Sequence, residues 1–187
     1  MIKEILETII GEMKNVLSKI NEEEAMTFIS QIDQAKRIFI YGEGRSGLMA
    51  KAFAMRLMHS GYQVYVVGET ITPSIEKEDL LVAISGSGET DTIYQFVQKL
   101  KKIGGKVGLV TTNQDSKIAR ISDYILKVPA ATKYRKPEEP DTIQPLGNQF
   151  DQAVHLLLDA LIIYKIQNKN QSTDINEEMR QRHANLE

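Results

Sequence analysis

The first 35 residues alternate apolar and polar positions with the period of a helix. Apolar residues recur every three or four positions, at Ile2, Ile5, Leu6, Ile9, Met13, Val16, Leu17 and Ile20. This spacing predicts an amphipathic helix. Ile10 widens its apolar stripe, and so wide a stripe can cover either the chain's own sheet or a neighbouring subunit. Asn21 is a favoured N-cap residue and predicts a second helix that ends near Ala35.

From residue 37 onward, short β-rich runs alternate with helical segments. We predict strands at 37–41, 63–67, 79–84, 106–111 and 124–128. We predict helices at 48–57, from about 91 to 103, at 116–121, from about 147 onward, and after the capping-box pair Asp174 and Glu177. Alternation of this kind is typical of βαβ units, and continuous apolar strands indicate helices on both faces of the sheet. The predicted fold is therefore α/β, a three-layer α/β/α sandwich with a five-stranded parallel sheet.

The stretch 129–146 interrupts this alternation. It holds four of the five prolines, Pro129, Pro137, Pro140 and Pro145, together with many charged residues. Proline clusters of this kind are typical of loops. A length of 187 residues suits a single domain. We therefore expect one domain over 1–187, with the N-terminal helices (1–35) and the C-terminal helix and tail (147–187) packed on the sheet or on neighbouring subunits.

The composition excludes several kinds of chemistry. The chain has no cysteine, so disulfides, thiolate nucleophiles, zinc–thiolate sites and iron–sulfur clusters are ruled out. Its net charge of -2 gives no reason to expect nucleic acid or an anionic membrane as a partner. The first residues lack the pattern of a secretory signal, and no apolar run approaches the roughly 20 residues of a membrane helix. We expect a cytoplasmic protein.

The loop Ser85–Thr90 carries the clearest candidate chemistry, and we call it the phosphate loop. It joins a predicted parallel strand to a helix, whose N-terminus offers unpaired N–H groups and a partial positive charge. Gly86 and Gly88 allow the backbone to approach a phosphate closely. The hydroxyls of Ser85, Ser87 and Thr90 add donors. An ordinary βα turn is the alternative, because glycine and serine are common in turns.

Two better-known phosphate motifs fit less well. The phosphate loop lacks the Gly-Lys-Ser/Thr ending of a P-loop. Gly42-x-Gly44-x-x-Gly47 spells a dinucleotide pattern, but Arg45 and Ser46 fill the positions where a cofactor phosphate would approach. Both loops follow strand ends, where ligands of open α/β sheets bind. We therefore predict a shared substrate site, made by Gly44, Arg45, Ser46, Ser85, Gly86, Ser87, Gly88, Glu89 and Thr90.

Taken together, the two loops resemble the sugar isomerase (SIS) domain. Several further segments resemble the 6-phospho-3-hexuloisomerase family within it, namely residues 49–59, Val67-Gly68-Glu69 with Thr72-Pro73, Ile143–Gly147 and the ending His183-Ala184-x-Leu186-Glu187. The resemblance covers nearly the whole chain. It implies a flavodoxin-like SIS fold, a homotetramer, a small sugar phosphate as ligand, and no metal or organic cofactor.

The resemblance also implies an activity. Members convert D-arabino-hex-3-ulose 6-phosphate into D-fructose 6-phosphate, in the formaldehyde-fixing ribulose monophosphate pathway. Moving the carbonyl through a cis-enediol requires a base over the C2–C3 bond and a donor for the enediolate oxygen. The implied base follows the Gln144–Gly147 segment, where glutamate is usual and Asp151 stands here. Aspartate is one methylene shorter, so either the backbone shifts, another group is the base, or Asp151 is only a helix-end charge.

Other acids and the three histidines are weaker candidates. Glu89 adjoins the phosphate loop and is either catalytic or a charge at the start of a helix, whereas Glu69 is predicted to be a plain loop acid. His59 is predicted to cap a helix, and His155 to be a buried core histidine. The resemblance implies that the tail folds over an active site, of its own or a neighbouring subunit. There His183 would shuttle protons, held by Glu187.

Two other functions stay open from the sequence. Another SIS isomerase, such as an arabinose 5-phosphate isomerase, would use the same phosphate loop, but the ending His-Ala-Asn-Leu-Glu argues against it. A sugar-phosphate sensor without catalysis is the second alternative, if aspartate at position 151 has abolished activity. The chain is not basic and has few N-terminal helices, so DNA binding is not favoured.

Overall fold

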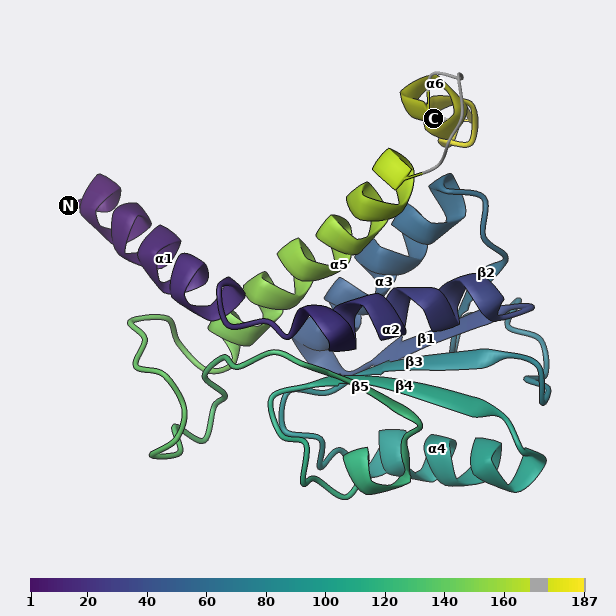
Figure 1. Cartoon of the computed structure of the whole chain (residues 1–187), viewed down its shortest axis with the longest axis horizontal. Coiled ribbons are helices and arrows are strands. Elements are labelled where there is room, and N and C mark those ends of the chain that lie inside the picture. Colours follow the sequence, from purple (N-terminus) through teal and green to yellow (C-terminus); the bar gives the residue numbers. More distant parts are fainter. Residues whose placement is uncertain (169–174, 187) are drawn as a thin grey trace.

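Five parallel strands form the centre of the chain in a computed structural model that describes residues 1–168 and 175–186 (Figure 1). The strands are β1 (Ile38–Gly42), β2 (Val64–Val66), β3 (Leu80–Ile84), β4 (Lys106–Thr111) and β5 (Tyr124–Lys127). They lie in the order β2-β1-β3-β4-β5, and every neighbouring pair is parallel. This is the flavodoxin-like order, and it confirms the predicted five-stranded parallel sheet.

Helices cover both faces of the sheet. They are α1 (Ile2–Leu17), α2 (Glu22–Gln34), α3 (Gly44–His59), α4 (Asp91–Ile103), α5 (Asn148–Asn168) and α6 (Ile175–Gln181), with a short 3₁₀ turn η1 (Ala119–Ile121). On one face α2, α3 and α5 pack over Ile38 and Ile40 of β1; on the other, α4 and η1 pack over Phe39 (Figure 1). Successive β1 side chains thus enter opposite cores, as in a strand buried on both faces. The three-layer sandwich is confirmed.

Two predicted elements differ from the observed ones. Helix α3 begins at Gly44, inside the segment predicted as a loop, because Gly44 adopts a φ of 56° that turns the chain directly from β1 into the helix. The predicted helix at 116–121 is only the turn η1, in which Ser116 Oγ accepts the N–H of Ala119 at 3.3 Å. Residues 169–174, which include Asp174 of the capping box, and Glu187 lie outside the described residues.

Helix α1 extends beyond the sandwich at its N-terminal end (Figure 1). Its later turns bury Met13 and Val16 in the core formed with α5. Its earlier apolar residues stay exposed to solvent, namely Ile2, Ile5, Leu6 and Ile10. No helix within the described ranges is long and apolar enough to cross a bilayer.

The turn from β1 into α3 depends on a close backbone approach, which gives a test of the fold. A Cβ at Gly47 would lie 2.6 Å from the carbonyl oxygen of Gly42, whereas a Cβ at Gly11 of α1 would meet nothing within 4 Å. Gly47→Ala should therefore lower the free energy of unfolding by about 1–3 kcal/mol, the cost of overpacking. Gly11→Ala should raise it by about 0.5–1 kcal/mol. Urea unfolding of both variants measures the difference, and equal effects would contradict the assigned approach.

Candidate active site

The candidate site lies where the sheet reverses its winding. Strands β1 and β3 are neighbours, but β1 leads into α3 on one face and β3 leads, through the phosphate loop, toward α4 on the other. The two chain segments diverge beyond the carboxyl ends of these strands. Ligands of open α/β sheets bind at such switch points. Arg45 and Ser46, at the start of α3, follow the carboxyl end of β1, and the phosphate loop follows the carboxyl end of the neighbouring β3.

Side-chain hydroxyls and neighbouring strands fix the phosphate loop. Ser85 is buried, and its Oγ lies 3.0 Å from Thr90 Oγ1 and accepts the N–H of Gly88 at 3.2 Å. The carbonyl of Gly86 accepts hydrogen bonds from Thr111 Oγ1 and Thr112 Oγ1, on β4 and just after it. Thr90 is the N-cap residue of α4, yet among the described residues no side chain caps this helix. The first N–H groups of α4 are therefore available to an anion.

Gly88 closes the phosphate loop tightly against the turn that follows β4. It has a φ of 68°, and a Cβ there would lie 2.0 Å from Ser116 Oγ. Only glycine accommodates both constraints. The sequence analysis explained Gly88 by the close approach of the backbone to a phosphate. The structure adds a second explanation, because the close packing against Ser116 also requires glycine at this position.

Glu89 points away from the start of α3. Its Oε1 accepts the N–H of Lys117, beyond β4, at 3.1 Å. This contact directs the carboxylate toward the segment after β4. Glu89 borders a cavity of about 200 Å³, together with Ser87.

That cavity has a wall that the sequence did not predict. Thr112 and Asn113, after β4, line it on one side, and Tyr134 and Lys136, from the long loop 129–146, line it on another. The position of Thr112 and Asn113 at a strand's carboxyl end was the available signal. Nothing in the local sequence marks Tyr134 or Lys136, because only tertiary folding brings the long loop beside the phosphate loop.

Asp151 lies at the start of α5 and faces the start of α3. Its Oδ1 accepts a hydrogen bond from Ser46 Oγ at 3.0 Å, and its Oδ2 accepts one from Arg45 Nε at 3.1 Å. Arg45 also donates through Nη2 to Asn148 Oδ1, one turn earlier on α5. The Asp151 side chain is 6% exposed, and that of Arg45 is 58% exposed. The structure thus brings together the predicted residues Arg45, Ser46 and Asp151, with Asn148 as an unpredicted fourth member.

The environment of Asp151 raises the pKa of its carboxyl group above the ordinary value. Burial is the largest cause, and the hydrogen bonds from Ser46 and Arg45, with the charge of Arg45, offset part of it. A raised carboxyl pKa suits a general base that must accept a proton from carbon near neutral pH. The charged group that faces Asp151 is the guanidinium of Arg45.

Helix α5 also touches the phosphate loop directly. A Cβ at Gly86 would lie 3.2 Å from the ring of Phe150, the residue before Asp151. The small size of Gly86 therefore lets the first turn of α5 pack against the loop. Three segments meet here: the start of α3, the phosphate loop, and the start of α5.

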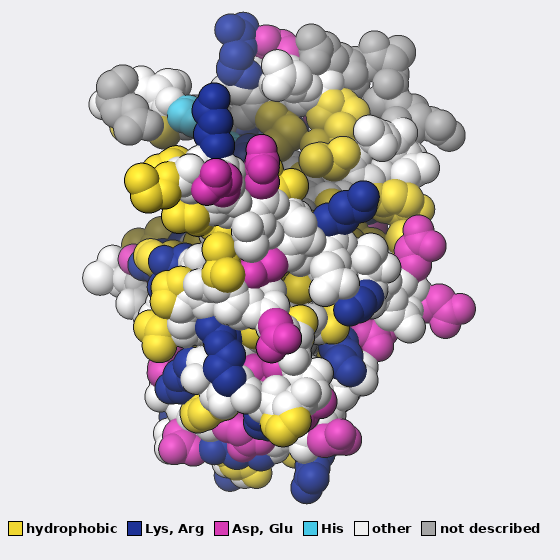
Figure 2. Space-filling view, turned by 90° about the vertical axis from the view of Figure 1, so that its left-hand side faces the viewer, with side chains coloured by type: hydrophobic (Ala, Val, Ile, Leu, Met, Phe, Trp, Pro, Cys, Tyr) yellow, Lys and Arg dark blue, Asp and Glu magenta, His cyan; other side chains and the backbone are white. Residues whose placement is uncertain are grey.

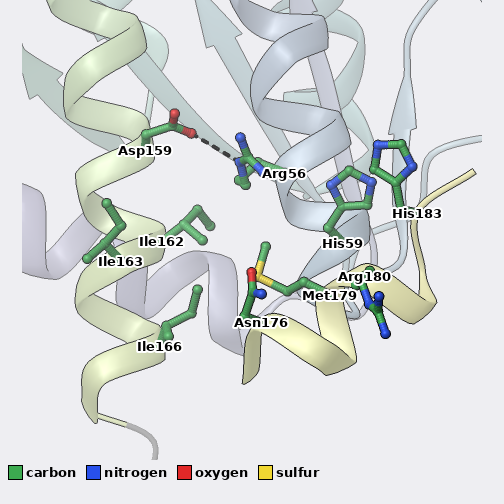
Figure 3. Close-up of a pocket in the computed structure, with 10 residues that line it drawn as sticks. All are labelled: Arg56, His59, Asp159, Ile162, Ile163, Ile166, Asn176, Met179, Arg180 and His183. Carbon is green, nitrogen blue, oxygen red and sulfur yellow. Dashed lines mark ion pairs between the residues drawn. The ribbon is translucent and has the colours of Figure 1, made fainter. Parts of the chain in front are cut away.

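His183 lies at the other end of α3. Its ring stacks on that of His59, with centroids 5.2 Å apart (Figure 3). Arg182 Nη1 donates to the carbonyl of His59 at 3.1 Å. Arg45 and His59 are 14 positions apart on helix α3, so about 21 Å of helix separates them. Within one chain, His183 is therefore remote from Asp151.

The stacked histidines border a cavity of about 420 Å³ between α3, α5 and α6 (Figure 3). This cavity is larger than the one beside the phosphate loop. Its other lining residues are half apolar, such as Ile162, Ile163 and Met179 of α5 and α6, and half polar, including the ion pair Arg56–Asp159 (3.5 Å). The volume of a cavity therefore does not by itself identify the candidate site. The site is identified by its place at the carboxyl ends of the strands and by its hydrogen-bond donors.

The remaining candidates have mixed outcomes. The prediction that His155 is a core histidine is wrong: it is exposed on α5, because the helix turns this position outward between buried neighbours. His59 lies at the C-terminal end of α3, as predicted, and is buried under His183. Glu69 is ion-paired with Lys51 of α3 at 2.7 Å, which fits the expected loop acid.

The chain is similar in sequence and fold to known proteins. The SIS domain family matches residues 31–137. The chain is 39% identical to the 3-hexulose-6-phosphate isomerase of Bacillus subtilis, over 98% of both chains, and 36% identical to that of Methylomonas aminofaciens, over 97% of both. A crystal structure from Methanococcus jannaschii, for which a 3-hexulose-6-phosphate isomerase function has been inferred, superposes with a TM-score of 0.83 at 31% identity, covering 98% of this chain and 99% of that one.

A domain match over more than half of the chain, with relatives over nearly its whole length, defines the class. The chain belongs to the SIS family of sugar isomerases. Within that family, its relatives of known activity include the 3-hexulose-6-phosphate isomerases, as the resemblance of its loops and ending indicates.

The stacked histidines give a test by pH. Burial, then the charges of His183 and Arg56, lower the pKa of His59 below its ordinary value of 6.5. Docking of α6 on α3 should therefore be complete above about pH 6.5 and be lost as the pH falls through the lower folded-state pKa. Amide hydrogen exchange of residues 175–181 between pH 7.5 and 5, corrected for intrinsic rates, measures this loss.

The His59→Gln variant has no imidazole to protonate, so its exchange protection should not change with pH. His155→Gln, on the exposed side of α5, should behave as the parent does. Identical pH profiles for the parent and His59→Gln would remove His59 from the docking of α6.

Proposed function

We propose that the protein is a sugar-phosphate isomerase that converts D-arabino-hex-3-ulose 6-phosphate into D-fructose 6-phosphate, as the names of its relatives suggest. The observation that carries this proposal is the buried Asp151 carboxylate, held by Ser46 and Arg45 beside a phosphate loop that offers hydroxyl and N–H donors. Such a site offers what the reaction needs: donors that bind the phosphate of the substrate, and a base with a neighbouring cation.

The chemistry needs one base and one stabilised oxygen. Asp151 removes the proton from C2 of the ketose, the electrons form the C2–C3 double bond, and the carbonyl oxygen at C3 becomes an enediolate. Arg45 stabilises this developing negative charge. The protonated Asp151 then returns the proton at C3, while the hydroxyl proton of C2 moves to the oxygen at C3. The product carries its carbonyl at C2.

Aspartate at this position is compatible with a base role. Ser46 and Arg45 of α3 donate hydrogen bonds to its two oxygens. The position of the carboxylate is therefore set by α3 as well as by α5, which carries Asp151. The raised pKa of Asp151 favours proton transfer from carbon. These features support the aspartate as base over the alternative of a catalytically silent sensor.

We further propose that His183 of a neighbouring subunit completes the site in a homotetramer. Within one chain His183 is stacked on His59, far from Asp151. Its proposed task, moving the hydroxyl proton between the substrate oxygens, therefore requires a second copy of the chain.

Exposed apolar side chains support an assembly. On α1 they include Ile2 (69% exposed) and Ile10 (66%), and on α3 they include Leu48 (60%). Figure 2, viewed from the side on which α1 projects, shows hydrophobic side chains interspersed with charged ones over this face. Apolar surface of this kind is typical of contacts between subunits. The cytoplasmic location stays a prediction.

The base gives the first test of function. A synthase generates the hexulose phosphate from formaldehyde and ribulose 5-phosphate, and fructose 6-phosphate is followed through glucose 6-phosphate oxidation. Asp151→Asn should lower kcat by about 10²–10⁴-fold, the range for loss of a general base. Asp159→Asn is the matched control on α5, where Asp159 pairs with Arg56 instead.

Each outcome of this assay is informative. Full activity in Asp151→Asn would move the base to another group, and an inactive parent that still binds fructose 6-phosphate would favour the sensor. Running ribulose and arabinose 5-phosphates as alternative substrates decides between this isomerase and another SIS isomerase.

The phosphate loop gives a second test. Ser87→Ala removes a hydroxyl beside the cavity. Because a hydrogen bond to a charged group contributes about 1.5–3 kcal/mol, KM should rise roughly tenfold or more while kcat changes little. Ser122→Ala is the control, since the Ser122 hydroxyl donates to the carbonyl of Ile118 near η1. Unchanged KM in Ser87→Ala would exclude this hydroxyl from the phosphate contacts.

A further inference from the structure

Glu12, on α1, is the start of a hydrogen-bonded path that ends at the candidate base. We propose that Glu12 is a positioning residue that holds Arg45 against Asp151 through Gln144 and Asn148. The proposal rests on the proposed function, since it concerns the geometry of the same base.

The carboxylate of Glu12 gathers the segment just before α5. Its Oε2 accepts hydrogen bonds from Thr142 Oγ1 at 2.5 Å and from Gln144 Nε2 at 2.9 Å, and its Oε1 accepts the N–H of Ile143 at 2.7 Å. Gln149 Nε2 lies 3.5 Å from the same carboxylate. Four donors thus converge on one half-buried carboxylate.

A continuous relay runs on from Gln144, which is buried. Its Oε1 accepts a hydrogen bond from Asn148 Nδ2 at 2.7 Å. This contact fixes the orientation of the Asn148 amide, so that its Oδ1 faces Arg45 Nη2. Arg45 in turn donates to Asp151 through Nε. Each hydrogen bond along the path joins one donor to one acceptor. Rotating the side-chain amide of Gln144 or Asn148 by 180° would place donor against donor or acceptor against acceptor.

The relay controls a group that is otherwise free to move. The Arg45 side chain is 58% exposed, and a long exposed side chain adopts many rotamers unless both ends of its fork are held. Asn148 and Asp151 hold them. If the Asn148 amide lost its contact with Gln144, Arg45 would be held by Asp151 but no longer by Asn148. Its guanidinium would then occupy several positions.

The ionised state of Glu12 suits this role. Burial alone would raise the pKa of Glu12, but the hydrogen bonds from Thr142, Gln144, Ile143 and Gln149 outweigh it and lower the pKa below its ordinary value. Glu12 therefore remains an acceptor of all these donors throughout the neutral range. It also lies on the helix whose other end presents exposed apolar side chains, so the path connects that helix to the site.

A reciprocal exchange tests the path. Glu12→Gln places an amide against the amide of Gln144, and Gln144→Glu places a carboxylate against Glu12. The double variant restores a donor at position 12 and an acceptor at position 144, which still accepts from Asn148. The hydroxyl of Thr142 can reverse because it both donates and accepts. Net charge is the same in the double variant and the parent.

We expect kcat to fall about tenfold to a hundredfold in each single variant, because small displacements of catalytic groups have effects of this size. KM should stay within about twofold of the parent value, because neither substitution touches the phosphate loop. The double variant should recover to within about threefold of the parent. Glu7→Gln, an equal charge change on the exposed side of α1, is the control that should leave kcat unchanged.

A second readout does not depend on turnover. Arg45 lowers the pKa of Asp151, so its release in Glu12→Gln should move the ¹³C NMR titration of the Asp151 carboxyl to higher pH, and the double variant should move it back. If the parent proves inactive, the proposed function fails, and this titration still decides on the path. A titration unchanged in Glu12→Gln overturns the proposal. A second outcome also overturns the proposal: the double variant does not recover activity, and every variant unfolds at a lower temperature than the parent. Glu12 would then only anchor α1.

Discussion

The buried carboxylate of Asp151 is the constraint on which the site depends. A charge removed from water is costly unless polar partners compensate for it, and here Ser46 and Arg45 of α3 supply them. Compensation is incomplete, because the pKa of Asp151 stays above its ordinary value. The same environment that weakens the charge therefore makes the carboxylate a better proton acceptor. Helices α3 and α5 must stay in register for this pair to exist.

The two parts of the candidate site differ in their chemistry. The phosphate loop is built from hydroxyls, backbone N–H groups and a helix N-terminus, and in the proposed function it would bind a phosphate without a lysine or arginine of its own. The sugar end would then face the Arg45–Asp151 pair. This division fits a chain of nearly neutral net charge, since no basic field is needed where local geometry supplies the donors.

The candidate proton shuttle lies far from the candidate base within one chain. His59 and Arg45 lie at opposite ends of α3, so the tail packs away from that chain's own candidate base. The proposed role of His183 therefore depends on the proposed oligomer, which the exposed apolar positions of α1 would favour. Glu12 places the same helix in contact with the segment that orients Arg45.

The sequence by itself determined the layers, the strands and the phosphate loop. These follow from local periodicity and from glycine and serine at a strand end, which act over a few neighbouring residues. It also marked Arg45, Ser46 and Asp151 separately, but their pairing spans about a hundred positions and needed the packing of α5 on α3. Only the tertiary structure decided that His155 faces solvent, that Glu89 bonds Lys117, and that Asn148 joins the site. Side-chain partners of this kind depend on which elements become neighbours in space, and local sequence patterns carry little information about that.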